Sequence, residues 1–187
     1  MAELKFYRVN VDIPKNVDVI VESNTIIIKG TKGEVRRKFI NPRIEIVKED
    51  NVLIVRTKNG IKGIESDKNF VCTYAAHLKN MIVGVVSGYV SKVKICSGHF
   101  PMQVSLDSKS VIIKNFLGEK LPRRANIMEN VKVKIDGDVI TITGIDKESV
   151  SQTAARIEQS TRITNKDRRI FQDGCFITQK ARVEQDG

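Results

Sequence analysis

Short runs of β-branched residues, separated by turn residues, make up most of the first third of the chain. The runs cover 17–21, 25–30, 34–39, 43–47 and 52–57. Val and Ile favour strands because their side chains pack well on a pleated surface. Ser, Asn, Asp, Gly and Pro lie between the runs and suit tight turns. This pattern predicts short strands joined by turns.

A second series of similar runs covers 102–106, 110–115, 131–135 and 139–144. An Asp-Gly pair separates the last two runs, and this dipeptide is typical of a tight hairpin. The segment 88–96 precedes the series, and we expect it to form a strand that enters it.

Each series ends in a segment with helical periodicity. Apolar and small residues recur at three- and four-residue steps over 71–82 and again over 150–161, which is the spacing of one helix face. Ser66 or Asp67 is suited to cap the first helix, and Asp146 the second. A pair of alanines in each helix would allow close packing against a sheet.

The two series are copies of one unit. IIIKGTKGE at 26–34 corresponds to VIIKNFLGE at 111–119, and DKNFVCTYAAHL at 67–78 corresponds to DKESVSQTAARI at 146–157. The matches occur in the same order, which favours a duplicated domain over chance similarity.

The predicted fold class is α+β, with two tandem duplicated domains, each an antiparallel sheet with one packed helix. We place the N-terminal α+β domain at 1–84. The C-terminal α+β domain, at 85–187, carries a basic C-terminal extension.

The composition indicates a polyanionic partner. The 187 residues carry a formal net charge of +10, and cations that neutralise phosphates release condensed counterions. We find no amphipathic helix or lipid anchor for a membrane surface and no signal peptide. The longest apolar run, 82–90, falls short of a bilayer span.

The chain has three cysteines, an odd number at wide spacing: Cys72, Cys96 and Cys175. This pattern favours reduced thiols in a cytosolic protein.

No catalytic or cofactor motif is evident. His77 and His99 are far apart and have no ligand-spaced Cys or His beside them, so we expect no metal site. The loop from Gly30 to Gly33 links two predicted strands, whereas a Walker loop links a strand to a helix. A basic hairpin tip is therefore the better interpretation, and we expect neither an enzyme nor a cofactor.

Positive charge is clustered along the chain. The clusters comprise Lys29, Lys32, Arg36, Arg37, Lys38 and Arg43; Lys92 and Lys94 with His99; Lys114, Lys120, Arg123 and Arg124; and Arg162, Lys166, Arg168, Arg169, Lys180 and Arg182. A solvated face is an equally good interpretation of any one cluster.

The segment 162–174 differs from the other clusters because apolar residues punctuate it. We expect Ile170 and Phe171 to pack and so to fix the loop while its cations project. Preordered cations lose less entropy on binding phosphate than cations on a free tail. Arg also suits bidentate phosphate recognition and stacking on bases.

The chain resembles the large-subunit ribosomal protein family numbered six in bacteria and nine in eukaryotes, and the eukaryotic form is the closer match. The resemblance is densest in HFP at 99–101, NFLGEK at 115–120 and VSQTAARIEQSTRITNKDRRIFQDG at 150–174. Cys175 and Phe176 depart from the family, which usually has an aliphatic residue and a Tyr there. Both substitutes are apolar, so packing should survive without a Tyr hydroxyl bond.

The resemblance implies a structural constituent of the large ribosomal subunit, in the cytoplasm, that supports translation without a cofactor, membrane or small-molecule substrate. It implies that the C-terminal domain binds ribosomal RNA near the sarcin–ricin loop and factor-binding region. The N-terminal domain would meet neighbouring ribosomal proteins near the stalk base. The predicted RNA contacts are Lys166, Arg168, Arg169 and Lys180, then Lys114, Lys120, Arg123 and Arg124, together with Lys92, Lys94, His99 and Arg162.

Two further classes of function remain open from the sequence. One is a free RNA-binding regulator built on the same fold. The other is a protein-interaction module whose charges only keep it soluble. An enzyme is the least favoured class.

Overall fold

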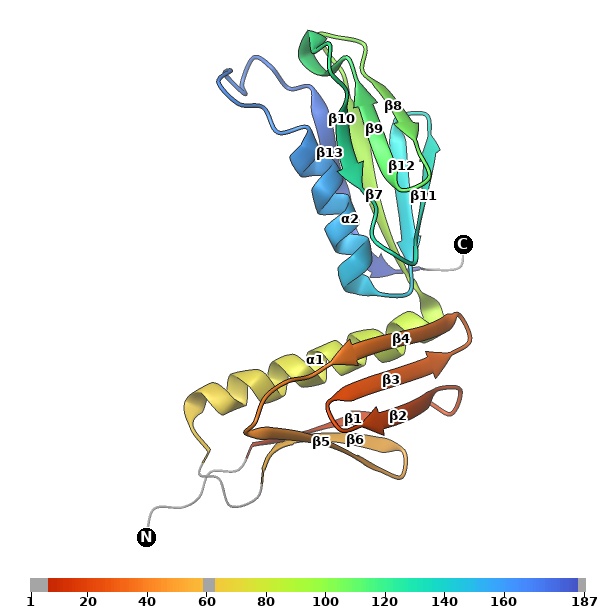
Figure 1. Ribbon diagram of the computed structural model, residues 1–187, viewed down its shortest axis with the longest axis vertical. Helices are drawn as coiled ribbons and strands as arrows, with labels where there is room; N and C mark the ends of the chain where they lie inside the picture. Colours follow the sequence, from red (N-terminus) through yellow and green to blue (C-terminus); the bar gives the residue numbers. More distant parts are fainter. Residues whose placement is uncertain (1–6, 59–62, 185–187) are drawn as a thin grey trace. The chain divides into compact units, whose positions relative to one another are not determined.

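The computed structural model describes residues 7–58 and 63–184 (Figure 1). Contacts divide the chain into two units, Met1–Ser87 and Gly88–Gly187. The predicted boundary after residue 84 falls inside the last turn of the first helix, which continues to Ser87. The outermost residues of the two predicted domains, 1–6 and 185–187, lie outside the described part of the chain.

The described residues of the first unit form two antiparallel three-stranded sheets and one helix. One sheet has the order β1-β6-β5 and the other β2-β3-β4. Their bounds are β1 Arg8–Asp12, β2 Asp18–Glu22, β3 Thr25–Gly30, β4 Gly33–Lys38, β5 Ile44–Glu49 and β6 Val52–Thr57, followed by α1 Glu65–Ser87.

The first unit has two sheets where the sequence predicted one. Strand β4 pairs with β3, and β5 pairs with β6. Pro42 lies between β4 and β5 and has no N–H to donate, which favours a break in pairing there. The strand β1 was not predicted from the sequence.

Helix α1 covers the first unit with one apolar face. Val71 and Leu78 are fully buried, as the helical spacing predicted, and so is Val85, one turn beyond the predicted segment. At Gly30, on β3, an added Cβ would lie 2.7 Å from Val85, so the close approach of helix and sheet needs glycine. By length and composition alone, α1 is long and apolar enough to cross a membrane. In the first unit, however, its apolar face packs against the strands of the two sheets.

The first helix begins differently from the prediction. It starts at Glu65, so Asp67 lies within the first turn rather than at a cap. The Asp67 carboxylate is almost fully buried, accepts a hydrogen bond from the backbone N–H of Ile64 and pairs with the Arg43 guanidinium at 2.9 Å. The hydrogen bond from Arg43 is the main reason that the pKa of Asp67 is lowered.

The second unit repeats this plan and extends it. One sheet has the order β10-β9-β8 and the other β11-β12-β7-β13. Their bounds are β7 Tyr89–Cys96, β8 Gln103–Leu106, β9 Ser110–Lys114, β10 Arg123–Asn126, β11 Val131–Asp136, β12 Val139–Gly144 and β13 Gly174–Val183, with a short 3-10 turn at Phe116–Gly118 and helix α2 Lys147–Ser160.

The duplication predicted from the sequence is visible in the topology. The first pair of matched motifs covers most of β3 and β9, each the middle strand of a three-stranded sheet, and the second pair lies in α1 and α2. Strand β1 lies at a sheet edge, whereas the corresponding β7 is internal because β13 pairs with it. Among the described residues, β13 therefore has no counterpart in the first unit.

Helix α2 packs into the second unit as the periodicity predicted. Val150 and Ile157 are fully buried beside Val93, Ile113 and Ile140 of the sheets.

Asp146 caps α2 as predicted. Its carboxylate accepts hydrogen bonds from the backbone N–H groups of Glu148 and Ser149, two donors that a helix start otherwise leaves without partners.

Candidate nucleic-acid interface

The basic segment 162–173 connects α2 to β13, and both of its ends are fixed. At the end of α2, the Thr161 hydroxyl accepts a hydrogen bond from the backbone N–H of Cys175 at 2.9 Å. One turn earlier, the Glu158 carboxylate accepts from the backbone N–H of Ile177, also at 2.9 Å. The helix end is thereby tied to the first residues of β13.

Asp173 anchors the other end of the segment. Its carboxylate is almost fully buried and accepts hydrogen bonds from three successive backbone N–H groups, those of Gly98 at 2.6 Å, His99 at 3.1 Å and Phe100 at 3.2 Å. Burial raises the pKa of Asp173. The three backbone hydrogen bonds and the His99 side chain together lower this pKa by more than burial raises it, so it lies below its ordinary value. The ionised carboxylate clamps the 97–100 turn to β13.

The segment between these anchors is a turn closed around Asp167. The backbone N–H groups of Ile170 and Phe171 donate to the Asp167 carbonyl. The Arg169 side chain pairs with the Asp167 carboxylate at 2.8 Å, and this hydrogen bond lowers the pKa of Asp167. The ammonium of Lys166 lies 4.9 Å from the centre of the Phe171 ring.

The prediction that two apolar residues fix this turn is half right. Phe171 is half-buried and its ring lies 5.2 Å from that of His99. The prediction for Ile170 is wrong, because this side chain is 62% exposed and lines a groove instead of the core. The cations project as expected, since Lys166, Arg168 and Arg169 are all exposed.

Arg123 differs from the other predicted contacts because its guanidinium binds backbone carbonyls at the end of α2. It pairs with Glu119 at 2.6 Å and donates to the backbone carbonyls of Ser160 and Arg162 at 2.8 and 3.1 Å. It also lies 4.2 Å from the centre of the Phe116 ring. These contacts assign Arg123 to holding the end of α2, and its contact with RNA stays a prediction.

The strand register gathers further cations on the solvent face of the four-stranded sheet. Lys134, Thr141 and Lys92 lie opposite one another in a row across β11, β12 and β7, and directly opposite residues share a face. In the next row, Lys94 lies beside Phe176 of β13. The exposed cations of these strands are Lys92, Lys94, Lys132, Lys134, Lys180 and Arg182.

Sequence reasoning missed Lys132 and Lys134 as candidates for this face. The signal was present in VKVKI at 131–135, where strict alternation places both lysines on the side away from the core. Lys134 also pairs with Asp136 at 3.0 Å.

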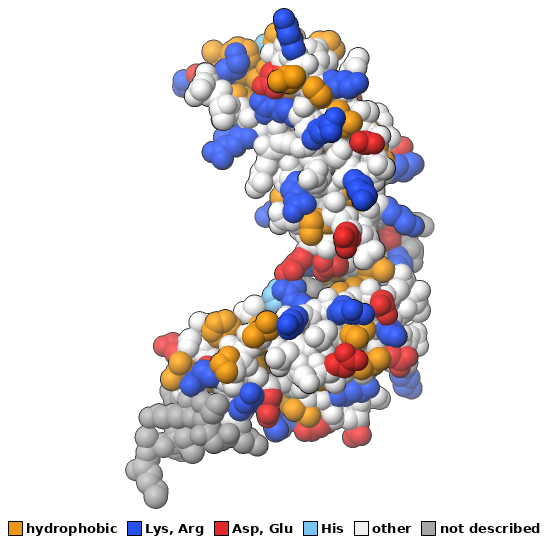
Figure 2. Space-filling model, in the orientation of Figure 1, with side chains coloured by type: hydrophobic (Ala, Val, Ile, Leu, Met, Phe, Trp, Pro, Cys, Tyr) orange, Lys and Arg blue, Asp and Glu red, His pale blue; other side chains and the backbone are white. Residues whose placement is uncertain are grey.

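Not all predicted contacts come together on this sheet. Lys114 and Arg124 lie on β9 and β10 of the other sheet, and Lys120 lies between those strands. All three are exposed. Figure 2 shows Lys and Arg side chains spread over the second unit, with hydrophobic side chains among them at the end that carries the basic segment.

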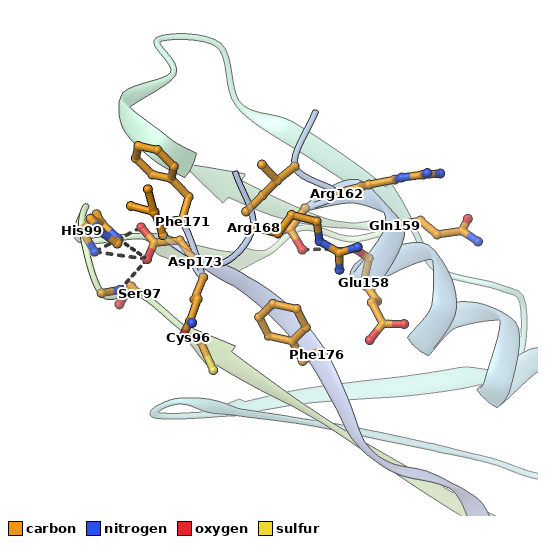
Figure 3. A pocket seen from close by; sticks show the side chains of 15 residues that line it. Cys96, Ser97, His99, Glu158, Gln159, Arg162, Arg168, Phe171, Asp173 and Phe176 are labelled. Atoms are coloured by element: carbon orange, nitrogen blue, oxygen red, sulfur yellow. Dashed lines mark hydrogen bonds and ion pairs between the residues drawn. The ribbon is translucent and has the colours of Figure 1, made fainter. Parts of the chain in front are cut away.

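A groove of about 1000 Å³ opens beside the basic segment (Figure 3). The groove is lined by the end of β7, the end of α2, the basic segment and the start of β13. Cys96, Glu158, Arg162, Arg168 and Phe176 are among the side chains that line it. Within residues 7–58 and 63–184, no three His, Cys, Asp or Glu side chains gather where they could hold a metal ion.

Comparison with known proteins points to one family. A family model described as Ribosomal protein L6 matches residues 13–88 and 100–174, one segment in each unit. The chain is similar to the large ribosomal subunit protein uL6 of Methanosarcina mazei, with 46% identity over 91% of this chain and 96% of the relative. It is also similar to the uL6 protein of Desulfurococcus amylolyticus, with 45% identity over 96% of this chain and 98% of the relative.

Proposed function

Because the chain belongs to the ribosomal protein L6 family, and is a large-subunit ribosomal protein rather than an enzyme, we propose that its second unit binds ribosomal RNA. Following the family resemblance, the contact lies near the sarcin–ricin loop and the factor-binding region of the cytoplasmic ribosome. The first unit meets neighbouring ribosomal proteins near the stalk base.

The observation that carries this proposal is the basic segment held at both ends. The anchors at Thr161 and Asp173 order the backbone before RNA arrives. The cations of Lys166 and Arg168 remain exposed between them. Immobilising a flexible side chain and its backbone costs binding free energy, so an ordered cationic turn binds phosphate more tightly than the same residues on a free tail.

The basic segment and the sheet face form one binding surface in this proposal. Phe176 connects them, because it lines the groove beside the segment and lies opposite Lys94 on the sheet. The proposed phosphate contacts are Lys166, Arg168, Arg169 and Lys180, then Lys92, Lys94, Lys114, Lys120, Arg124, Arg162 and His99. Arg123 contributes by positioning the end of α2.

The salt dependence of RNA binding tests this proposal. The affinity of the purified full chain for a ribosomal RNA fragment containing the sarcin–ricin loop is measured by filter binding over a range of salt concentrations. Arg168→Ala removes one proposed phosphate contact and should lower the slope of log affinity against log salt by about one unit. The exposed Lys15 of the first unit provides a control, because Lys15→Ala removes the same charge. Equal slopes for both variants would contradict the proposed surface.

A further inference from the structure

The groove beside the basic segment has more apolar surface than phosphate contacts require. Ile163, Phe171 and Phe176 line it together with Arg162 and Arg168. Its volume of about 1000 Å³ lies at the upper end of the range for clefts that hold small ligands. A site for phosphate alone would need only the two arginines.

Phe176 presents an aromatic ring to this groove. The side chain is 37% exposed and lines the groove, and in the view of Figure 3 the ring lies between Cys96 and Glu158. The ring rests against Gly174, where an added Cβ would lie 3.2 Å from the ring's Cζ atom. The backbone therefore supports the ring and leaves part of its surface open.

The charges around the groove favour an anionic occupant. Arg162 and Arg168 are exposed at its rim. The two carboxylates that line it both accept hydrogen bonds from the backbone. Asp173 is buried under the N–H groups of three residues, and Glu158 accepts from the N–H group of Ile177. A partly exposed aromatic ring with two exposed arginines beside it complements the flat base and charged phosphates of a nucleotide.

The groove is already formed in the free protein. The bonds of Thr161 to Cys175, of Glu158 to Ile177 and of Asp173 to the 97–100 turn hold its walls. A preformed site loses little conformational entropy on binding.

We propose that this groove receives one unstacked base of the bound RNA, with the base on the Phe176 ring and the flanking phosphates on Arg162 and Arg168. The inference rests on the proposed function and adds to it a means of recognising single-stranded or bulged nucleotides. Paired A-form RNA hides its base edges in a deep groove, whereas an unpaired base is free to stack on an aromatic side chain.

Fluorescence provides a direct test, because the chain contains no Trp. Phe176→Trp places a single indole at the groove. Two RNA hairpins that differ by one nucleotide are compared: one is fully paired, and the other carries that nucleotide as a single bulge in the same stem. We expect the bulged hairpin to quench the Trp fluorescence and the paired hairpin to leave it unchanged.

Affinity measurements with Phe176→Leu and Phe176→Tyr complete the test. Leu keeps an apolar side chain but removes the aromatic face, so affinity for the bulged hairpin should fall about tenfold while the salt slope stays the same. Tyr keeps the ring and should bind as the natural chain does. Circular dichroism of each variant shows whether the fold is intact.

The outcomes separate this inference from the proposed function. If Arg168→Ala lowers the salt slope but Phe176→Leu binds both hairpins normally and Trp is not quenched, the base site is wrong and phosphate binding stands. If neither hairpin binds in a salt-dependent manner, both proposals fall. Quenching by an acidic peptide but not by the bulged hairpin would overturn the base site in favour of a protein segment.

Discussion

Replacing Asp173 with Asn tests whether this buried carboxylate clamps the second unit together. The substitution preserves the shape of the side chain but removes its charge. One of the two oxygens becomes an NH₂ group, which faces backbone N–H groups that also donate. At least one of the N–H groups of Gly98, His99 and Phe100 would then lose its acceptor.

The magnitude follows from the number of these hydrogen bonds. A hydrogen bond to a charged group contributes about 1.5–3 kcal/mol net. The three donors belong to exposed residues, so water will replace part of what is lost. We therefore expect Asp173→Asn to lower the free energy of unfolding of the second unit by about 2–3 kcal/mol. In a unit of about 100 residues, this corresponds to a fall in Tm of roughly 10–20 °C.

The pH dependence of this effect has a defined sign. The pKa of Asp173 is lower in the folded chain than its ordinary value, so the unfolded chain binds the proton more readily. The stabilisation is therefore fully present above the unfolded pKa of about 4 and is lost as pH falls through the folded pKa. The difference between Asp173→Asn and the natural chain should be complete at pH 7 and should shrink below about pH 4.

Urea unfolding followed by circular dichroism measures the stability, and hydrogen exchange detected by mass spectrometry locates the loss. Asp136→Asn is the matched control, because this aspartate lies on the same unit with its side chain 56% exposed. Faster exchange should be confined to the second unit and should include the 97–100 turn. A loss of unfolding free energy below about 0.5 kcal/mol, with unchanged exchange at that turn, would contradict the clamp. It would show that water satisfies these three N–H groups as well as the carboxylate does.

Three further predictions concern other parts of the molecule. Gly30→Ala should destabilise the first unit by about 1–3 kcal/mol in urea unfolding, because the new Cβ would overlap Val85; unchanged stability would show that α1 moves away freely. Arg123→Ala should lower the stability of the second unit by about 1–2 kcal/mol, because four hydrogen bonds are lost, while the salt slope of RNA binding stays the same; a slope reduced by one unit would instead make it a phosphate contact. Burial raises the pKa of the Cys175 thiol to about 12, so iodoacetamide at pH 8 should modify the exposed Cys72 and spare Cys175 in the native chain, as peptide mass spectrometry would show; equal labelling without urea would contradict this burial.

The sequence by itself determined the local elements and their repetition. Runs of Val and Ile predicted most strands, because β-branched side chains suit a pleated, half-buried surface. Asp146 predicted the start of α2, because a cap depends on residues only two or three positions apart. The repeated motifs predicted the duplication, which the paired topologies of the two units confirm.

The sequence also identified the basic segment as the most distinctive part of the candidate site. The alternation of charged and apolar residues between 162 and 174 separated it from an ordinary solvated face. That reasoning correctly expected exposed cations on an ordered turn. It assigned Ile170 to the core, however, because an apolar side chain in a short turn carries no local sign of whether it will be covered.

Tertiary structure alone decided how these elements meet. The residues of β13 pair with residues of β7 that lie 78 positions (Gly174 and Cys96) to 94 positions (Val183 and Tyr89) earlier in the sequence, and no local pattern encodes such a partner. The same long-range contact lets Asp173 bind the 97–100 turn and places Phe176 beside Lys94. Arg123 was indistinguishable in sequence from a phosphate-binding arginine, because its role depends on the carbonyls that the end of α2 brings to it. Hydrogen bonds and stacking act over a few ångströms in space, and only the folded chain sets those distances.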